Sequence, residues 1–350
     1  MPFNSAQLSQ GANVQLDYFL RNDPVDQVNT ERPFLDWLMK RQKPAPGGNQ
    51  YLVEQVYQQN ANNYQNYFGA DQVTYNQRDL IRQAKYPWYN FHDGFGLDED
   101  TLAQNGIIVT DDREAQASQA EKVQLTNLLQ ENYTALKMGV QEKLNLELLW
   151  NGTQSAKACP GLDYLVSTTP TVGVVGGLDP SVYTWWRNQV NTGINGTTTA
   201  MIDAMEQTWR NTIRVGKTRP DFIIAGGSFI DAYRDMASQT VNRQIYVKDG
   251  MKNGVSIDAS TSAIYFKGIE IIWDPTFDVM DSTYAPAIPW AKRCYFLNSK
   301  TIRLRPVDGH WMVNRKPERL YDRYIHYWGL TSKYRLTCNL RRANAVLSIA

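Results

Sequence analysis

The chain has 350 residues, of which 42% are hydrophobic and 12% aromatic. This is enough apolar material for one large core or two smaller ones, and it excludes an intrinsically disordered protein. Thirty-six Lys and Arg residues nearly balance 35 Asp and Glu residues, so no net charge draws the whole chain to nucleic acid or to an anionic membrane. The first residues lack a signal-peptide pattern and no stretch reaches membrane-spanning length, which predicts a soluble protein without a membrane partner.

Residues 1–50 are mostly polar and predict an extended N-terminal arm. One short amphipathic helix is expected at residues 34–39, before a stretch rich in Pro and Gly at residues 43–48. An arm of this kind cannot bury its apolar side chains within itself. We therefore expect Phe34 and Trp37 to contact another subunit.

Residues 51–100 are expected to form an extended two-stranded loop. A strand is predicted at residues 51–57, and a second strand-like run spans residues 73–88. The segment between them is rich in Asn and Gln, and its aromatic residues are Tyr64, Tyr67 and Phe68. Because an isolated hairpin is at best marginally stable in water, we expect another subunit to cover these aromatic side chains.

A long helix is the strongest secondary-structure prediction, and it spans residues 113–150. Apolar residues recur at spacings of three and four after an acidic cap at residues 110–112, and the helix ends at Asn151 and Gly152. A helix of this length would extend ~57 Å at 1.5 Å per residue. Its single apolar stripe is not a sustained heptad repeat, so it needs a sheet or a neighbouring subunit behind it.

The central part of the chain is expected to be a compact α+β unit. Its predicted helices cover residues 198–215 and 228–238, and its predicted strands cover residues 222–225, 264–266 and 269–273. The C-terminal part alternates apolar and polar residues, which predicts strands at residues 294–297, 301–305, 311–313, 324–328 and 333–340.

The C-terminal part is also strongly basic. Residues 292–342 contain thirteen Lys and Arg against three Asp and Glu, a net charge of +10, so the remainder of the +1 chain carries −9. This asymmetry suits charge-complementary contacts between subunits, and a surface that faces DNA is a second interpretation.

The sequence offers few groups for catalysis, and we predict no catalytic, cofactor-binding or metal-binding residues. The three histidines, His92, His310 and His326, lack metal-ligand spacing. Three scattered cysteines are expected to be reduced, packed thiols. The glycine-containing stretches at residues 173–177, 216–218 and 226–228 depart from nucleotide-loop and nucleophile-elbow patterns and are expected to be turns.

Two features keep other functions open. Asp98 and Glu99 could be the paired carboxylates of a glycan-active hydrolase, with some of the ten tryptophans as sugar platforms, although the simpler interpretation is the start of a short helix. Trp185, Trp186 and Arg187 could bind a ligand ring, but such a set more often anchors a subunit interface or fills a small core.

Short motifs add a family resemblance to this pattern. Residues 161–166, 174–180 and 185–188 resemble the "GL … VGGID … WWRN" signature of one branch of the major capsid proteins of tailed bacteriophages. Residues 336–343 are similar to the end of the same proteins, with Cys338 followed by paired arginines.

This resemblance implies an α+β fold of the Hong Kong 97 type, with an N-terminal arm, an extended two-stranded loop and a long spine helix. The expected divisions are the arm (1–50), the extended loop (51–100), a peripheral domain with the spine helix (101–180), an axial domain (181–285) and further strands of the peripheral domain (286–350).

The resemblance also implies a structural role without enzymatic activity. Such a protein would assemble with itself into hexamers and pentamers of an icosahedral head around double-stranded DNA, in the cytoplasm of a bacterial host, and would reside in the virion. Non-specific contact with DNA, and portal, scaffolding and decoration proteins, are the further partners that it implies. A shell protein of a nanocompartment, of the encapsulin type, is the alternative with the same fold. Some family members form a cross-link from Lys to Asn, but residues 58–72 contain no lysine, so we do not expect it here.

Overall fold

The computed structural model describes residues 30–58, 62–77, 79–106, 119–214, 218–240, 264–281, 288–315 and 324–350. The chain divides into two units, Met1–Glu31 and Arg32–Ala350, and every element below belongs to the second unit. Of the N-terminal arm that the sequence predicts, residues 1–29 lie outside the described residues.

The structure contains the helices expected at residues 34–39, 113–150, 198–215 and 228–238 and the short helix expected to begin near Glu99, together with two short helices, at residues 162–165 and 275–279, that were not predicted. They are α2 (Pro33–Lys40), α3 (Glu99–Gln104), α4 (Gln119–Leu149), α5 (Leu162–Leu165), α6 (Ala200–Ile213), α7 (Gly227–Thr240) and α8 (Pro275–Val279). Short 3-10 turns are η1 (Thr184–Trp186), η3 (Trp290–Lys292) and η4 (Arg341–Ala343). The long helix is confirmed as α4, which has 31 residues, while residues 113–118 of the predicted span lie outside the described residues.

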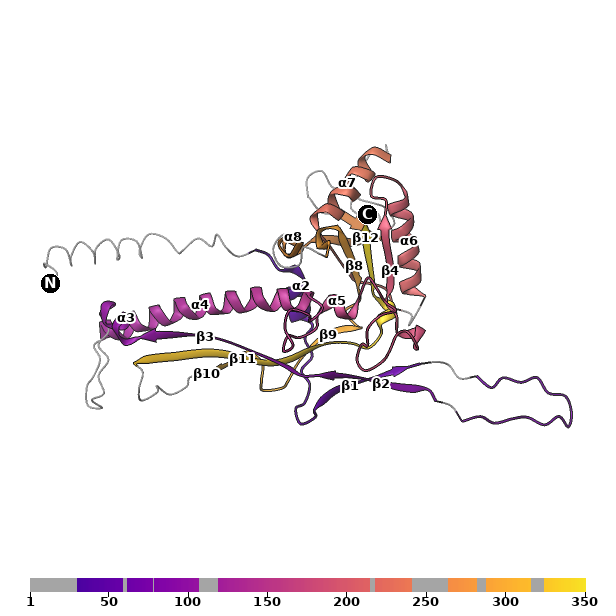
Figure 1. Ribbon diagram of the computed structural model, residues 1–350, viewed down its shortest axis with the longest axis horizontal. Coiled ribbons are helices and arrows are strands. Elements are labelled where there is room, and N and C mark those ends of the chain that lie inside the picture. The colour runs from indigo at the N-terminus through magenta and orange to yellow at the C-terminus, as the bar shows by residue number, and fades with distance from the viewer. Residues whose placement is uncertain are drawn as a thin grey trace. The chain divides into compact units, whose positions relative to one another are not determined.

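A four-stranded sheet lies against α4. It consists of β3 (Tyr89–Asp98), β9 (Ile302–Pro306), β10 (Val313–Arg315) and β11 (Ile325–Cys338). Strand β11 is central: β3 pairs along one side of it, and β10 and β9 pair in turn along the other. Leu136 and Val140 of α4 pack on Leu330 of β11, so the sheet supplies the backing that the long apolar stripe needs (Figure 1).

The structure differs from the predicted loop at β3. The expected boundaries place residues 89–98 in the extended loop, whereas β3 pairs with β11 over its whole length, from Tyr89 with Tyr334 to Asp98 with Ile325. The predicted strands at 324–328 and 333–340 are likewise one strand, β11. Alternation of apolar and polar residues shows which face of a strand is buried, but it does not identify the strand's partner.

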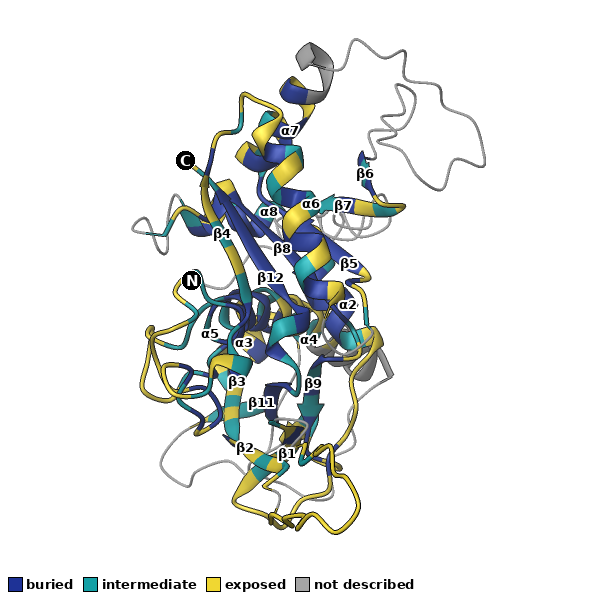
Figure 2. Ribbon diagram, turned by 90° about the vertical axis from the view of Figure 1, so that its right-hand side faces the viewer, coloured by how far each residue is buried: buried dark blue, intermediate teal, exposed yellow. Residues whose placement is uncertain are grey.

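A six-stranded sheet forms the second part of this unit. Its strands, in order, are β4 (Gln189–Ile194), β12 (Ala345–Ile349), β8 (Arg293–Leu297), β5 (Phe222–Ala225), β7 (Ile269–Trp273) and β6 (Ile264–Phe266). One face packs on Met205 and Trp209 of α6 and on Phe229 of α7. Side chains from the other face, including Tyr295, belong to the main core cluster. Every residue of β5 and β8 is buried, as Figure 2 shows.

The C-terminal strands divide between the two sheets, which corrects the expectation for residues 286–350. Strands β9, β10 and β11 complete the four-stranded sheet, but β8 and β12 belong to the six-stranded sheet. The chain passes between the sheets at residues 298–301 and again at residues 339–344. A chain that visits each sheet twice can have consecutive strands in different layers, and strand patterns alone do not reveal this.

Helix α2 also corrects an expectation, because it is buried within its own chain. Phe34 is 0% exposed and Trp37 is 6% exposed, and the Trp37 ring stacks on Phe222 with 4.8 Å between ring centroids. After the helix, the amide of Lys43 donates to the carbonyl of Leu304 in β9. The amphipathic helix therefore covers apolar surface of the same chain, and Phe34 and Trp37 are not available to another subunit.

Candidate interaction surface

The predicted hairpin exists as a separate two-stranded sheet of β1 (Tyr51–Tyr57) and β2 (Ile81–Pro87). The strands pair in register from Tyr51 with Pro87 to Tyr57 with Ile81. One face turns Val56, Ala84 and Tyr86 into the core. The opposite face leaves large apolar side chains exposed: Tyr51 by 42%, Val53 by 43%, Tyr57 by 76% and Ile81 by 46%. The hairpin is thus anchored on one side and uncovered on the other.

Residues 62–77 continue this hairpin and hold four strongly exposed aromatic side chains. Exposed fractions are 79% for Tyr64, 68% for Tyr67, 89% for Phe68 and 92% for Tyr75. The segment turns at Gly69, where φ is +56°, and the amide of Phe68 donates to Oδ2 of Asp71 at 2.9 Å across this turn. Tyr64, Tyr67 and Phe68 are therefore exposed, on a segment that Figure 1 shows continuing beyond β1 and β2.

The base of the hairpin is tied to the loop that carries the glycine motif. The amide of Lys85 donates to the carbonyl of Gly176 at 2.8 Å, and the hydroxyl of Tyr86 donates to the carbonyl of Cys338 at 2.7 Å. Gly176 has φ of +62°, and a Cβ at this position would lie 3.1 Å from Cβ of Ala84. The glycines are therefore needed for a turn and a close approach, as expected for residues 173–177.

The motif at residues 185–188 is a structural anchor. Trp186 is 1% exposed and its Nε1 donates to the carbonyl of Val175 at 2.9 Å, which corrects the expectation that Trp186 contacts another subunit. Trp185 is half-buried beside it, with 5.8 Å between ring centroids. Arg187 is half-buried and its Nε donates to the carbonyl of Pro180 at 2.7 Å. Trp186 therefore fills a core, which was one of the two interpretations, and does not anchor a subunit interface.

Arg341 joins two of the separated motifs, residues 161–166 and 185–188, in one buried network. Its guanidinium donates to the carbonyl of Leu165 at 2.8 Å, to the carbonyl of Trp186 at 2.9 Å and to Oδ1 of Asn188 at 3.1 Å. Burial lowers the pKa of Arg341, although the side chain is held by these three acceptors. This role was not predicted from the sequence, where Arg341 belongs to the basic segment and to the paired arginines after Cys338. The signal available was its place in the family-like ending.

The cysteines and the buried ion pair are also structural. Cys159, Cys294 and Cys338 are free and buried, which confirms packed thiols, and burial raises the pKa of the Cys338 thiol to about 12. Asp163 accepts a hydrogen bond from Arg293 at 2.7 Å in the core. Burial raises the pKa of Asp163, and the neighbouring Arg293 opposes this shift. Thiols with raised pKa values are poor nucleophiles.

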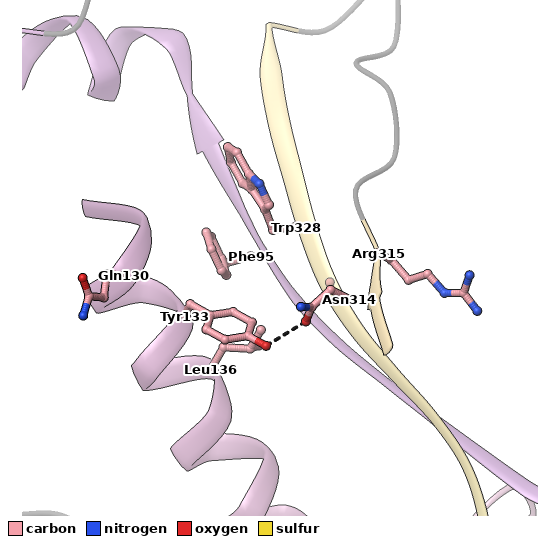
Figure 3. A pocket seen from close by; sticks show the side chains of 8 residues that line it. Phe95, Gln130, Tyr133, Leu136, Asn314, Arg315 and Trp328 are labelled. Atoms are coloured by element: carbon pink, nitrogen blue, oxygen red, sulfur yellow. Dashed lines mark hydrogen bonds between the residues drawn. The ribbon is translucent and has the colours of Figure 1, made fainter. Parts of the chain in front are cut away.

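A cavity of about 280 Å³ opens between α4 and the four-stranded sheet (Figure 3). The rings of Phe95 and Trp328 stack at 5.5 Å, and the hydroxyl of Tyr133 donates to Oδ1 of Asn314 at 2.7 Å. Gln130 and Arg315 lie at its rim. The lining has one cationic side chain and no carboxylate or histidine, so it offers no acid–base pair.

The hydrolase alternative gains no support from its residues. Asp98 is exposed at the end of β3, and Glu99 begins α3, as the simpler interpretation predicts. Oε1 of Glu99 lies 3.5 Å from Nε2 of His326. Within the described ranges, no three His, Cys, Asp or Glu side chains gather to hold a metal ion. No helix among the described residues is long and apolar enough to span a bilayer.

Comparisons with known proteins place the fold. No protein-family model and no curated protein matches the sequence. A chain of the cyanophage A-1(L) capsid matches with a TM-score of 0.65 and 15% identity, over 96% of this chain and 98% of that chain. A Mycobacterium phage Bobi structure gives a TM-score of 0.55 at 8% identity, covering 97% and 98%. The mature capsid of bacteriophage PhiM1 gives 0.52 at 10% identity, covering 94% and 90%.

The similarity to these structures extends over nearly the whole chain. It shows that the chain has the Hong Kong 97-type fold of tailed-phage capsid proteins, which confirms the predicted α+β fold class. Two of the three structures are described as phage capsids.

Proposed function

We propose that this chain is the major capsid protein of a tailed bacteriophage, assembling into hexamers and pentamers of an icosahedral head around double-stranded DNA. The observation that supports it most is the hairpin, because residues 62–77 and the outer face of β1 and β2 expose aromatic and aliphatic side chains. Exposed apolar surface of this kind marks an interface. On a shell fold, the simplest cover is a second copy of the same chain.

The proposed contacts with other subunits are Tyr64, Tyr67 and Phe68 in residues 62–77. Two half-buried side chains at η1, Trp185 and Arg187, are further candidates. Many weak contacts of this kind give a stable closed shell, because symmetry repeats each contact and each subunit is held at several places. Portal, scaffolding and decoration proteins are further proposed partners, because the resemblance to tailed-phage capsid proteins implies them.

Contact with packaged DNA is proposed as non-specific and would use only part of the basic C-terminal segment. Arg293, Arg335 and Arg341 are buried and take no part in an outer surface. Exposed or half-buried cations such as Lys300, Arg303 and Arg315 remain for phosphate groups. Such binding would weaken as salt is raised, because it releases counterions.

The assembly of the purified chain tests this proposal. We expect sedimentation and negative-stain microscopy to show closed particles, whose hexamers and pentamers a cryo-EM reconstruction would resolve. Replacing Tyr64, Tyr67 and Phe68 together by Ser should abolish particles while the chain stays folded. A matched control replaces the exposed Val172, Val174 and Val182 by Ser and should still assemble. Monomers that persist under all conditions would contradict the proposal.

The contents of particles from the natural source separate the two kinds of shell. Double-stranded DNA that is protected from nuclease supports a phage head. Particles that hold protein cargo and no protected DNA would instead show a nanocompartment, the alternative with the same fold.

A further inference from the structure

Arg335 is a buried cation of the four-stranded sheet. It lies on β11, is 1% exposed, and is paired in register with another cation, Arg305 on β9. Within the described residues, Arg335 makes no ion pair with a carboxylate, and its Nε has no hydrogen-bond partner. Burial of an uncompensated charge is strongly unfavourable, so other groups must stabilise this guanidinium.

Three tyrosine rings surround it. The guanidinium carbon of Arg335 lies 5.4 Å from the ring centroid of Tyr86, 5.0 Å from that of Tyr89 and 5.7 Å from that of Tyr164. Its Nη1 also lies 3.8 Å from Sγ of Cys159. Ring faces carry negative charge, and their attraction for a cation is strongest where water is excluded. The three rings therefore form an aromatic cage around Arg335.

The cage lies where the hairpin joins the rest of the chain. Tyr86 is the penultimate residue of β2, Tyr89 is the first residue of β3, and Tyr164 lies in α5. One cation thus holds the end of the hairpin, the start of the four-stranded sheet and the segment that precedes the glycine loop. A ring face accepts a cation over a wider range of angles than a bidentate ion pair does.

We propose that Arg335 is the positioning residue of the hairpin: through the Tyr86, Tyr89 and Tyr164 cage it fixes the base of β1 and β2 while allowing small changes of angle. Subunits in hexamers and pentamers must make the same contacts at slightly different angles, so this attachment would serve both environments. The use of the cage in assembly rests on the proposed function. The attachment of the hairpin itself does not.

Hydrogen exchange of the unassembled chain tests the attachment directly. In Arg335→Met, amides of β2 should exchange about tenfold faster than in the wild type, while amides of β12 change much less. Arg335→Lys keeps a cation for the rings and should restore most of the protection. The control Arg303→Met removes a half-buried cation from neighbouring β9 and should leave β2 unchanged. Equal protection of β2 in Arg335→Met and the wild type would refute the role.

A second pair of variants keeps the test decisive if Arg335→Met does not fold. Tyr164→Leu removes one ring of the cage, and Tyr164→Phe keeps the ring but removes the hydrogen bond from its hydroxyl to the carbonyl of Val174, 2.8 Å long. Faster exchange of β2 in Tyr164→Leu but not in Tyr164→Phe supports the cage. Equal exchange in both variants overturns it.

Assembly is the second readout. If the wild type forms closed shells, Arg335→Met should give fewer closed shells and more open or irregular ones, and Arg335→Lys should recover the yield. Normal shells from Arg335→Met would overturn the part of the proposal that concerns assembly. If the wild type forms no shells, the proposed function fails, while the exchange result still decides whether Arg335 positions the hairpin.

Discussion

The six-stranded sheet and the hairpin use similar side chains in opposite ways. In the sheet, Phe296 is fully buried, and its ring lies 5.8 Å from that of Phe266 and 6.1 Å from that of Trp209. In the hairpin, Phe68 is 89% exposed. The apolar side chains of the sheet are buried within one chain, and their burial stabilises the fold. The hairpin leaves its aromatic side chains exposed to solvent, so they are available for association with another chain.

The largest expected effect is on the sheet side of this comparison. Phe296→Ala removes a fully buried ring and leaves a cavity, so we expect the free energy of unfolding to fall by ~3–5 kcal/mol. Urea denaturation of the unassembled chain measures this loss. A loss below ~1 kcal/mol would mean that the core repacks around the gap, and that the sheet is less tightly packed than its burial indicates.

The next prediction compares alanine substitutions at two glycines, which lie in the part of the chain between the hairpin and the six-stranded sheet and should change stability in opposite directions. A Cβ at Gly94 of β3 would lie 2.6 Å from the carbonyl oxygen of Trp328, so Gly94→Ala should destabilise the fold by ~1–3 kcal/mol. A Cβ at Gly139 of α4 would meet no atom within 4 Å, so Gly139→Ala should stabilise the fold by ~0.5–1 kcal/mol. Thermal unfolding of both variants checks the opposite signs, and equal signs would contradict the packing of β3 on β11.

A smaller effect concerns a partly buried carboxyl beside the core. Burial raises the pKa of Glu147 above its usual value of 4.5, although the backbone amide of Cys159, which donates to Oε1 of Glu147, opposes this shift. The folded state therefore retains a proton that the unfolded state loses, and stability falls as the pH rises through the interval from 4.5 to the folded pKa. Glu147→Gln cannot lose this proton, so it should melt roughly 1 to 3 °C higher than the wild type at pH 7. The difference should vanish near pH ~4, where the wild-type carboxyl is protonated in both states, and a constant difference would contradict this cause.

The smallest effect on stability is expected in the hairpin. Phe68→Ala should change the free energy of unfolding by less than ~0.5 kcal/mol, because the exposed ring contributes little to packing within its own chain. Urea denaturation of Phe68→Ala and Phe296→Ala thus compares the loss of unfolding free energy from the same substitution in the two regions. A loss comparable to that of Phe296→Ala would show that the hairpin is part of the core and would remove its role as a free surface.

The longer helices and most strands could be predicted from the sequence, whereas the short helices α5 and α8 and the assignment of strands to layers could not. The periodicity of α4 and α6 depends on local spacing, so their positions follow closely from the residues. The partner of β3 depends on contacts far along the chain, and the same holds for β8 and β12. Periodicity contains no information on such contacts.

The aromatic surface of the hairpin could be predicted in part, because polar surroundings at Tyr64, Tyr67 and Phe68 indicate exposure. Phe34, Trp37 and Trp186 could not be told apart from them by residue type, and the structure buries all three. The net charge of residues 292–342 likewise does not show which of the cations in that segment are exposed. Arg335 and Arg341 look like surface cations in a count, and only the fold shows that rings and carbonyl groups enclose them.

The position of β12 has a consequence for synthesis. This strand lies between β4 and β8, although β4 leaves the ribosome much earlier. Until residues 345–349 emerge, β4 and β8 have no strand to join them, so the six-stranded sheet stays open up to that point of translation. A chain that terminates before β12 would present two unpaired edges and would be a substrate for chaperones and proteases. Strand β12 is thus the element on which the attachment of β4 to the rest of the six-stranded sheet depends.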